Sequence, residues 1–357
     1  MKNHIFSQTS LGLNVVAIGG GNGLSTLLSG LKNYVGEAES KPMWIKRLSA
    51  IVAVSDDGGS SGRLRDELKM PAPGDIRNCM VALSEDSHLL SKLFQHRFRG
   101  DGELGGHSFG NLFLAALSEI TGDFSEAVKL SSEILVSKGQ IYPATMEDVR
   151  LRAELDDGST VHGETNVGNV GNRIRNLRLE PETCHPLPEA IEAIGEANII
   201  TLGPGSLFTS LLPPLLVNDV SRSIAQSSAV KVYISNLMTQ PGETDGLSAR
   251  RHLEIVKEYS PEIDFDYVIV NNYPIRETQA ARYLDQGAQQ IGIADSITPE
   301  TIEGARIVYG NLLDEGRKVR HKPSRLADVV MLSALQQPQM RKMRDKIKSE
   351  IRDPVVI

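Results

Sequence analysis

The chain has 357 residues and a formal net charge of −7, and aromatic residues make up only 5% of it. An acidic protein with few aromatic side chains lacks the basic face and stacking rings that nucleic-acid binding uses, so we expect no nucleic-acid partner. Two cysteines are too few for a disulfide framework, and no apolar run approaches the ~18 residues of a membrane span. The first residues also lack the apolar core of a signal peptide, so we expect a cytoplasmic protein without membrane insertion.

The first recognisable unit is a strand, a glycine-rich turn and a helix near the N-terminus. Residues 15–18 are apolar and predict a buried strand, and the leucines after the turn recur at i, i+3, i+4 and i+7, which predicts an amphipathic helix. Glycines let the backbone approach a phosphate closely, and a helix start supplies N–H groups and a positive dipole end. We therefore expect the turn to bind a phosphate group through Gly19, Gly20, Gly21, Asn22 and Gly23.

The spacing of these glycines differs from that of two familiar phosphate-binding motifs. A G-x-G-x-x-G pattern that began at Gly19 would need a glycine at Leu24, and one that began at Gly21 would need it at Thr26. No Lys-Ser or Lys-Thr pair follows, so the turn is not a Walker A loop. A glycine turn that merely reverses the chain is the alternative.

The loop after the second predicted strand combines carboxylates, glycines and hydroxyls. Residues 50–54 are apolar throughout, as expected of a strand that is buried on both faces. Ligands of doubly wound sheets bind beyond the carboxyl ends of the strands, so this loop should lie beside the glycine turn. Its carboxylates can accept sugar hydroxyls or hold a divalent cation, and an acidic turn with a helix cap is the alternative. The candidate residues are Asp56, Asp57, Gly58, Gly59, Ser60 and Ser61.

Polar side chains at two further predicted helix starts have either a structural role or a role in ligand binding. Asp75 follows a loop of prolines and a glycine, and it can cap a helix or face the ligand with Arg77 and Asn78. His107 and Asn111 are four residues apart in another glycine-punctuated turn, which places them on one side of a helix start. For both helix starts, the sequence fits a structural role and a ligand-binding role equally well.

The second half of the chain adds a hairpin and more strands. Residues 149–155 and 160–164 flank the turn 156–159 and predict a small β-hairpin insertion at about 148–165. Residues 198–202 predict a strand that leads into Gly203, Gly205 and Ser206 before a helix. Strands predicted at 230–234 and 267–270 also end in polar residues. Since α/β sheets build their sites at this end of the strands, the sequence predicts a doubly wound, mostly parallel α/β fold.

Six segments together resemble the CofD/YvcK-like family (UPF0052), and specifically its gluconeogenesis-factor branch. They are residues 19–25, 56–65, 73–79, 106–112, 202–207 and 238–244, within a matching region that runs from 15 to about 325. The usual Thr of the first motif is Asn22 here, which keeps a polar side chain. The resemblance implies a Rossmann-like fold with three α/β/α layers.

The resemblance to this branch also implies a function. Its members are associated with UDP-sugars and with cell shape and cell-wall synthesis during growth on gluconeogenic carbon. It implies a regulatory protein without catalytic residues or a required cofactor, which acts through protein partners in wall synthesis. By the same resemblance, Tyr283 and Arg320 are expected to contact the nucleotide sugar. Tyr can stack on a uracil face, and Arg can bind a diphosphate with two hydrogen bonds.

Two other functions are the alternatives. The CofD branch transfers a phospholactate group (2-phospho-L-lactate) from a guanosine diphosphate donor to a deazaflavin with Mg²⁺, which Asp56 and Asp57 would hold as metal ligands here. Where that branch has a Ser-Pro-Ser-Asn-Pro-type turn, however, this chain has Gly-Pro-Gly-Ser at 203–206. A dinucleotide-dependent oxidoreductase is disfavoured because the glycine fingerprint fails.

We expect one nucleotide-binding domain over residues 12–330, followed by a helical tail over 331–357. The tail contains a basic helix at 340–348, for which a solvated face is the simplest interpretation. The sequence leaves the oligomeric state open, and a homo-oligomer is one of the alternatives.

Overall fold

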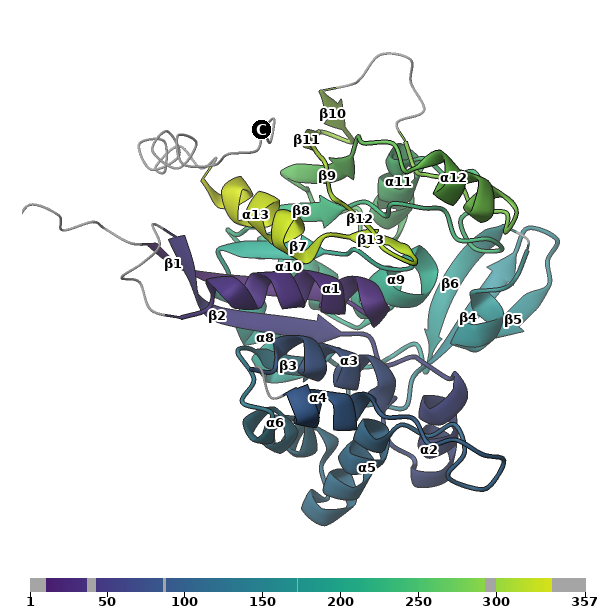
Figure 1. Cartoon of the computed structure of the whole chain (residues 1–357). Helices are drawn as coiled ribbons and strands as arrows, with labels where there is room; N and C mark the ends of the chain where they lie inside the picture. The colour runs from purple at the N-terminus through teal and green to yellow at the C-terminus, as the bar shows by residue number, and fades with distance from the viewer. Residues whose placement is uncertain (1–10, 37–42, 86–87, 172, 293–299, 336–357) are drawn as a thin grey trace, which may run out of the picture.

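The protein is built around an eight-stranded sheet whose strand order is β10-β11-β9-β8-β7-β1-β2-β3 (Figure 1). The computed structural model describes residues 11–36, 43–85, 88–171, 173–292 and 300–335. All neighbouring strands of this sheet run parallel except β10 and β11. The strands are β1 (Leu11–Gly19), β2 (Met43–Val52), β3 (Gln140–Pro143), β7 (Ile199–Leu202), β8 (Val230–Ile234), β9 (Tyr267–Asn271), β10 (Thr301–Ile302) and β11 (Ala305–Gly310).

The strand order reverses beside β1, which pairs with β2 on one side and with β7 on the other. The chain first builds outward through β2 and β3, then returns to β7 and builds in the opposite direction. Ile18 pairs with Leu202 and Gly19 with Val52, so three strands end at the same edge. A doubly wound sheet binds its ligands at this switch point. The expected doubly wound α/β fold is thus confirmed.

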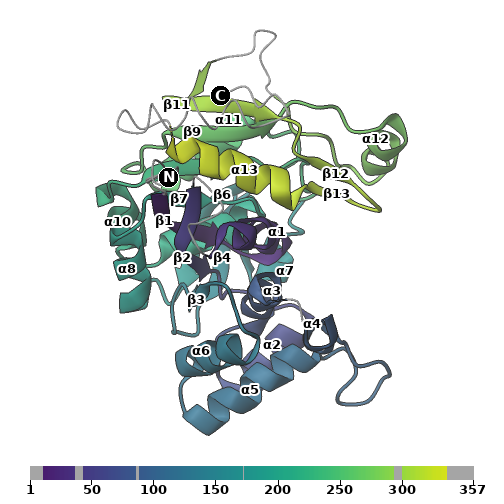
Figure 2. The ribbon, with the colours of Figure 1, turned by 60° about the vertical axis from the view of Figure 1, so that its left-hand side comes forward.

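Helices cover both faces of the sheet and complete three layers (Figures 1 and 2). α1 (Gly21–Leu31) and α13 (Pro323–Ala334) lie on one face, and α8 (Pro188–Gly195) and α10 (Val220–Gln226) lie on the other. A group of helices surrounds the β3 side of the sheet. It comprises α2 (Gly59–Leu68), α3 (Pro73–Leu83), α4 (His88–Gln95), α5 (Phe109–Thr121) and α6 (Phe124–Ile134). The remaining helices are η1 (Lys32–Tyr34), α7 (Glu164–Val167), the π-helix η2 (Leu207–Leu211), α9 (Leu212–Leu216), α11 (Ala249–Tyr259) and α12 (Glu277–Leu284). None of the helices in the described ranges is long and apolar enough to cross a membrane.

The expected hairpin insertion is a three-stranded antiparallel sheet, in the order β5-β4-β6. β4 (Arg150–Leu155) and β5 (Thr160–His162) form the predicted hairpin. β6 (Ile174–Glu180) lies in a stretch for which the sequence analysis named no strand, and it pairs along the whole of β4. Its buried residues Ile174, Leu177 and Leu179 are separated by polar residues, which hid the strand pattern.

The C-terminal end of the described chain is α13, which packs against α1. The expected division at 330/331 falls inside this helix, and the basic segment 340–348 lies outside the described residues. Gly30 makes the close contact between the two helices, because a Cβ atom there would lie 2.1 Å from the Pro323 carbonyl oxygen.

Gly30→Ala should therefore destabilise the fold by about 1–3 kcal/mol, the usual cost of overpacking a tight contact. The matched control is Gly195→Ala at the end of α8, where a Cβ would meet nothing within 4 Å. The control should change stability by less than ~1 kcal/mol, in the direction of helix propensity. Urea denaturation of both variants measures the difference. Equal stabilities would show that α1 and α13 can move apart at no cost.

Candidate functional site

Two glycine turns meet at the switch point. β1 ends at Gly19 and α1 begins at Gly21, whose φ of +59° favours glycine. A Cβ at Gly23 would lie 2.2 Å from the carbonyl oxygen of Pro204, in the turn after β7. Only glycine fits there. The first turn of α1 therefore lies directly against the turn between β7 and η2.

A cavity of about 350 Å³ opens where these turns meet, and we call it the switch-point cleft. Its walls come from the carboxyl ends of β1, β7 and β8 and from β13 (Val319–His321). Seven residues expected from the sequence line it: Gly20, Gly21, Asn22, Gly23, Gly205, Ser206 and Arg320. The other lining residues are Thr26, Pro204, Ser210, Asn236, Leu237, Met238, Gln240, Val319 and His321.

The turn after β7 is held in shape by side chains around it. Asn236 clamps Gly205 by accepting from its N–H at 3.1 Å and donating to its carbonyl at 2.7 Å. Ser206 donates to the carboxylate of Glu243, which also accepts from the Phe208 N–H at 2.9 Å. Desolvation raises the pKa of Glu243, and these hydrogen bonds offset part of the effect. Gly203 itself lies behind the cleft with φ +91°, a conformation that fits glycine.

Arg320 reaches the cleft from the opposite wall. It is exposed on β13, which pairs with β12 (Leu313–Glu315) in a separate two-stranded sheet. Among the described residues, no ion pair or hydrogen bond of its side chain is present. Its guanidinium is therefore available to an anion.

Tyr283 lies behind Arg320 and does not line the cleft. Its hydroxyl accepts a hydrogen bond from the Val319 N–H at 3.0 Å, and its ring packs against a small apolar cluster that contains Val319 and Leu237. Tyr283 thus supports the strand that carries Arg320. Stacking of its ring on a base, which we expected from the resemblance, would require a different position of the ring.

Asp75 occupies the start of α1. We considered it as a cap of α3, but that helix begins at Pro73, and Asp75 instead accepts from the Gly21 N–H at 2.7 Å. One of the N–H groups that we expected to meet a phosphate is therefore bound by a protein carboxylate. Desolvation of this carboxylate and the charge of Asp56 raise the pKa of Asp75 to about 7. Asn78 also bonds Asp75, and it accepts from Arg77 at 2.7 Å.

Asp56 and Asp57 point to different partners. Asp56 accepts from the Gly58 N–H at 2.9 Å in a local turn. Asp57 accepts from the N–H and the hydroxyl of Thr165, at 2.9 and 2.7 Å, and so fastens the insertion to the main sheet. Across the residues with described positions, no group of three or more His, Cys, Asp or Glu side chains is arranged to hold a metal ion. In the structure, each of the two carboxylates thus has hydrogen-bond partners of its own.

Glu164, at the start of α7, is a further acidic residue that the sequence analysis missed. Its pKa is raised well above the ordinary value by desolvation and by the charges of Asp75, Asp56 and Asp57. In the sequence, the only feature that drew attention to Glu164 was its place at the end of the predicted hairpin.

Ser60, Ser61, His107 and Asn111 form one buried network. The Ser60 hydroxyl lies 2.9 Å from Nδ1 of His107, and it accepts from the Asn111 amide at 3.1 Å. Asn111 also reaches Ser61 at 3.5 Å. Burial and the charge of Arg63 lower the pKa of His107, so its ring is neutral and can accept from Ser60. The network joins the starts of α2 and α5 and does not line the cleft; Gly58 and Gly59 form the turn into α2.

His321 is the least expected of the cleft residues. It is only 6% exposed, and its Nε2 has no hydrogen-bond partner. Burial lowers its pKa to about 4, and a hydrogen bond with the Ser235 backbone opposes that shift. The sequence indicated a site more clearly for three other cleft residues, because they follow a predicted strand: Asn236, Met238 and Gln240.

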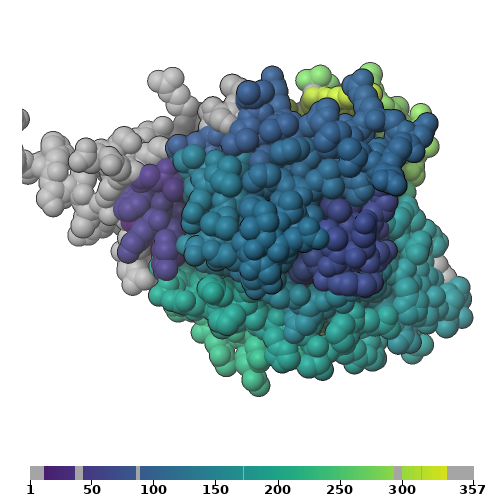
Figure 3. Space-filling model, turned by 90° about the horizontal axis from the view of Figure 1, so that it is seen from below, coloured from purple at the N-terminus to yellow at the C-terminus, as the bar shows by residue number. Residues whose placement is uncertain are grey.

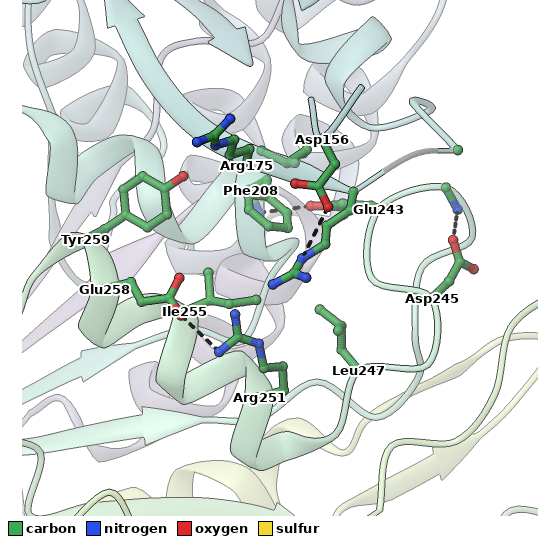
Figure 4. A pocket seen from close by; sticks show the side chains of 14 residues that line it. Asp156, Arg175, Phe208, Glu243, Asp245, Leu247, Arg251, Ile255, Glu258 and Tyr259 are labelled. Carbon is green, nitrogen blue, oxygen red and sulfur yellow. Dashed lines mark hydrogen bonds and ion pairs between the residues drawn. The ribbon is translucent and has the colours of Figure 1, made fainter. Parts of the chain in front are cut away.

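A larger cavity of about 660 Å³ lies between the insertion and α11 (Figure 4). Two of its three arginines have carboxylate partners: Arg173 pairs with Asp156 at 3.9 Å, and Arg251 with Glu258 at 2.9 Å. None of the candidate residues from the sequence lines it. The smaller switch-point cleft is the better candidate site, because the glycine turns and Arg320 converge there.

The fold and the cleft define the protein as a Rossmann-like α/β protein with a switch-point site. A family model described as "2-phospho-L-lactate transferase CofD" matches residues 15–313, and the chain belongs to this family. This region includes every strand of the central sheet (Figure 1), except the first residues of β1.

The relatives and solved structures agree with this assignment. A protein from Aquifex aeolicus is 47% identical over 327 residues, which cover 89% of this chain and 96% of the relative. A protein of Bacillus subtilis named "Gluconeogenesis factor" is 42% identical, with 89% and 96% covered. A crystal structure of a UPF0052 family member from Bacillus halodurans matches with a TM-score of 0.82 and 42% identity, over 89% of this chain and 99% of that one. The expected family resemblance is thereby confirmed.

Asp75→Asn should change how stability depends on pH. Because the folded-state pKa of about 7 exceeds the ordinary 3.8, the folded protein keeps a proton that the unfolded chain loses between these values. The stability of the wild type should therefore fall as the pH rises from 4 to 7, by up to about 4 kcal/mol from this residue.

Urea denaturation at pH 5 and pH 8 tests this expectation. Asn keeps an oxygen that can accept from Gly21, so Asp75→Asn should reduce the loss of stability between the two pH values. Asp101→Asn, in an exposed loop, is the control and should behave as the wild type does. A pH dependence that Asp75→Asn leaves unchanged would contradict the assignment.

Proposed function

We propose that the protein is a nucleotide-sugar-binding regulatory protein that binds a UDP-sugar in the switch-point cleft. The observation that carries the proposal is the convergence of two glycine turns with an arginine that has no carboxylate partner among the described residues. The names of relatives, which include "Gluconeogenesis factor", support a regulatory role during gluconeogenic growth. In this role the protein would act in the cytoplasm on cell shape and wall synthesis, through protein partners.

The cleft offers the groups that a diphosphate needs. Residues 20–23 form the start of α1, and residues 205–206 lead into η2, so both bring the backbone of a helix start within reach of a ligand. Arg320 faces them and can form two parallel hydrogen bonds with phosphate oxygens. A volume of about 350 Å³ lies within the range of ligand sites. The amide side chains of Asn22 and Gln240 can bond hydroxyls of the sugar or ribose.

The nearby carboxylates favour binding without a metal. Asp75 is bound to Gly21 and Asp57 to Thr165, so each already has a structural role. In this proposal no donor is consumed. The second candidate function, a CofD-like transferase with Mg²⁺, is favoured by the description of the family model alone.

Arg320→Ala should weaken UDP-glucose binding by roughly 10- to 150-fold, since a hydrogen bond to a charged group contributes ~1.5–3 kcal/mol. Arg317→Ala is the matched control, because Arg317 is exposed on the same hairpin and does not line the cleft. Isothermal titration with both variants measures the affinities. The wild type should bind UDP-glucose more tightly than NAD. A preference for NAD, or equal affinities of the two variants, would refute the proposal.

Chelation distinguishes the two candidate functions. We expect UDP-glucose to bind equally well in EDTA and to remain intact over hours in the presence of Mg²⁺. Asp57→Asn keeps an oxygen that can accept from Thr165, so this variant should retain binding. Release of a nucleotide that requires Mg²⁺ and is lost in Asp57→Asn would establish the transferase instead. Chromatography of the nucleotides measures the outcome.

A further inference from the structure

The switch-point cleft has two walls of different chemistry. The wall that α1 and the turn after β7 form carries glycines and polar side chains. The wall that faces it carries three apolar side chains, Leu237, Met238 and Val319. Leu237 and Val319 belong to one small apolar cluster, and Met238 packs against it, so the three lie together. We call these three residues the apolar wall.

The apolar wall takes the place in the cleft that we expected an aromatic ring to have. The ring of Tyr283 packs against the same cluster but does not line the cleft, whereas Leu237 and Val319 do. A flat ligand ring would therefore contact the apolar wall. A thioether such as that of Met238 makes favourable contacts with aromatic rings.

Gln240 supplies an unused polar group beside the apolar wall. It lines the cleft two residues after Met238, and Thr239 between them is buried and does not line it. The amide of Asn236 is already bound, through both its oxygen and its nitrogen, to Gly205. The Gln240 amide, in contrast, has no hydrogen-bond partner among the described residues, although the backbone N–H of this residue has one.

The charge in the cleft is confined to one residue. Of the described residues that line it, only Arg320 carries a charge at neutral pH, since none is acidic and burial lowers the pKa of His321 to about 4. The phosphates of a ligand would therefore lie between Arg320 and the glycine turns. The apolar wall and Gln240 remain for an uncharged part of the ligand.

A nucleobase fits this remaining surface better than a sugar does. A hexose carries hydroxyls around its ring, and each hydroxyl that lost water against the apolar wall without a new partner would cost free energy. Gln240 can bond one such hydroxyl but not several. A base has apolar faces and a single polar edge, which matches an apolar wall with one amide beside it.

We propose that the apolar wall binds the base of the nucleotide and that the Gln240 amide pairs with the N3–H and O4 of a uracil. This inference rests on the proposed function, a UDP-sugar in the switch-point cleft. An amide presents a donor and an acceptor side by side, which lets Gln bind adenine with two hydrogen bonds. The N3–H and O4 of uracil offer the complementary acceptor and donor.

Methylation of the base tests the pairing. Uridine diphosphate methylated at N3 lacks the donor, so the wild type should bind it roughly 2- to 12-fold more weakly than UDP, the factor that one neutral hydrogen bond contributes. Gln240→Ala should weaken UDP binding by a similar factor and should no longer distinguish the two ligands. Isothermal titration at pH 7 measures the four affinities. A wild type that binds both ligands equally, or a preference that Gln240→Ala retains, would overturn the proposal.

Gln95→Ala is the matched control. Gln95 is exposed at the end of α4, a helix that belongs to the blue face of the molecule in Figure 3, and it does not line the cleft. This variant should bind UDP and the methylated ligand as the wild type does, and circular dichroism checks that both variants are folded. Pyrophosphate has no base, so its affinity should fall in Arg320→Ala and stay unchanged in Gln240→Ala.

A comparison of UDP with UDP-glucose separates the base from the sugar. Gln240→Ala should weaken the binding of both ligands by the same factor. A loss confined to UDP-glucose would show that Gln240 bonds the sugar, and it would overturn the proposal while the proposed function stands. A wild type that binds neither ligand would overturn the proposed function and this inference with it.

Discussion

The contact between the start of α1 and the turn after β7 determines the geometry of the site. Gly23 lies so close to the Pro204 carbonyl that no side chain fits between them, and Asp75 fixes the Gly21 N–H from the other side. Both turns are thereby held at the switch point before any ligand arrives. Hydrogen-bond donors that are already ordered lose less conformational entropy when a ligand binds than donors that must first be ordered. This contact would therefore favour ligand binding.

The same contact places negative charge behind the glycine turn. Asp75, Asp56 and Glu164 interact with one another, and the pKa values of Asp75 and Glu164 are raised. A phosphate in the cleft would add further negative charge nearby, so the protonated form of Asp75 would be favoured on binding. The electrostatic attraction for a diphosphate must then come mainly from Arg320 and the helix starts.

Much of the fold could be predicted from the sequence, because its signals are local. Buried strands such as residues 15–18 and 198–202 are continuous apolar runs followed by glycines. β6 was missed because tertiary pairing with β4 stabilises a strand whose own sequence is polar at alternate positions. The sequence singled out glycines and Arg320 that line the cleft. The contacts of Ser60, His107 and Tyr283, in contrast, involve partners that are distant in sequence. The sequence hardly indicated His321 and Glu164 as notable residues, because only burial in the folded protein shifts their pKa values.

The two walls of the cleft differ in how firmly they are held. The glycine wall rests on the main core, where Leu24, Leu27 and Leu28 are fully buried. The arginine wall rests on a separate cluster of four buried apolar residues and on α12, which buries none of its own. Fewer buried apolar contacts mean lower local stability. A hydrogen bond contributes a larger share of the local stability on this side, because few apolar side chains are buried there. One example is the bond from the Val319 N–H to the Tyr283 hydroxyl, which helps to hold the strand that carries Arg320. In the proposed function, ligand binding would then depend on an arginine whose strand is supported by the Tyr283 hydroxyl and a small apolar cluster.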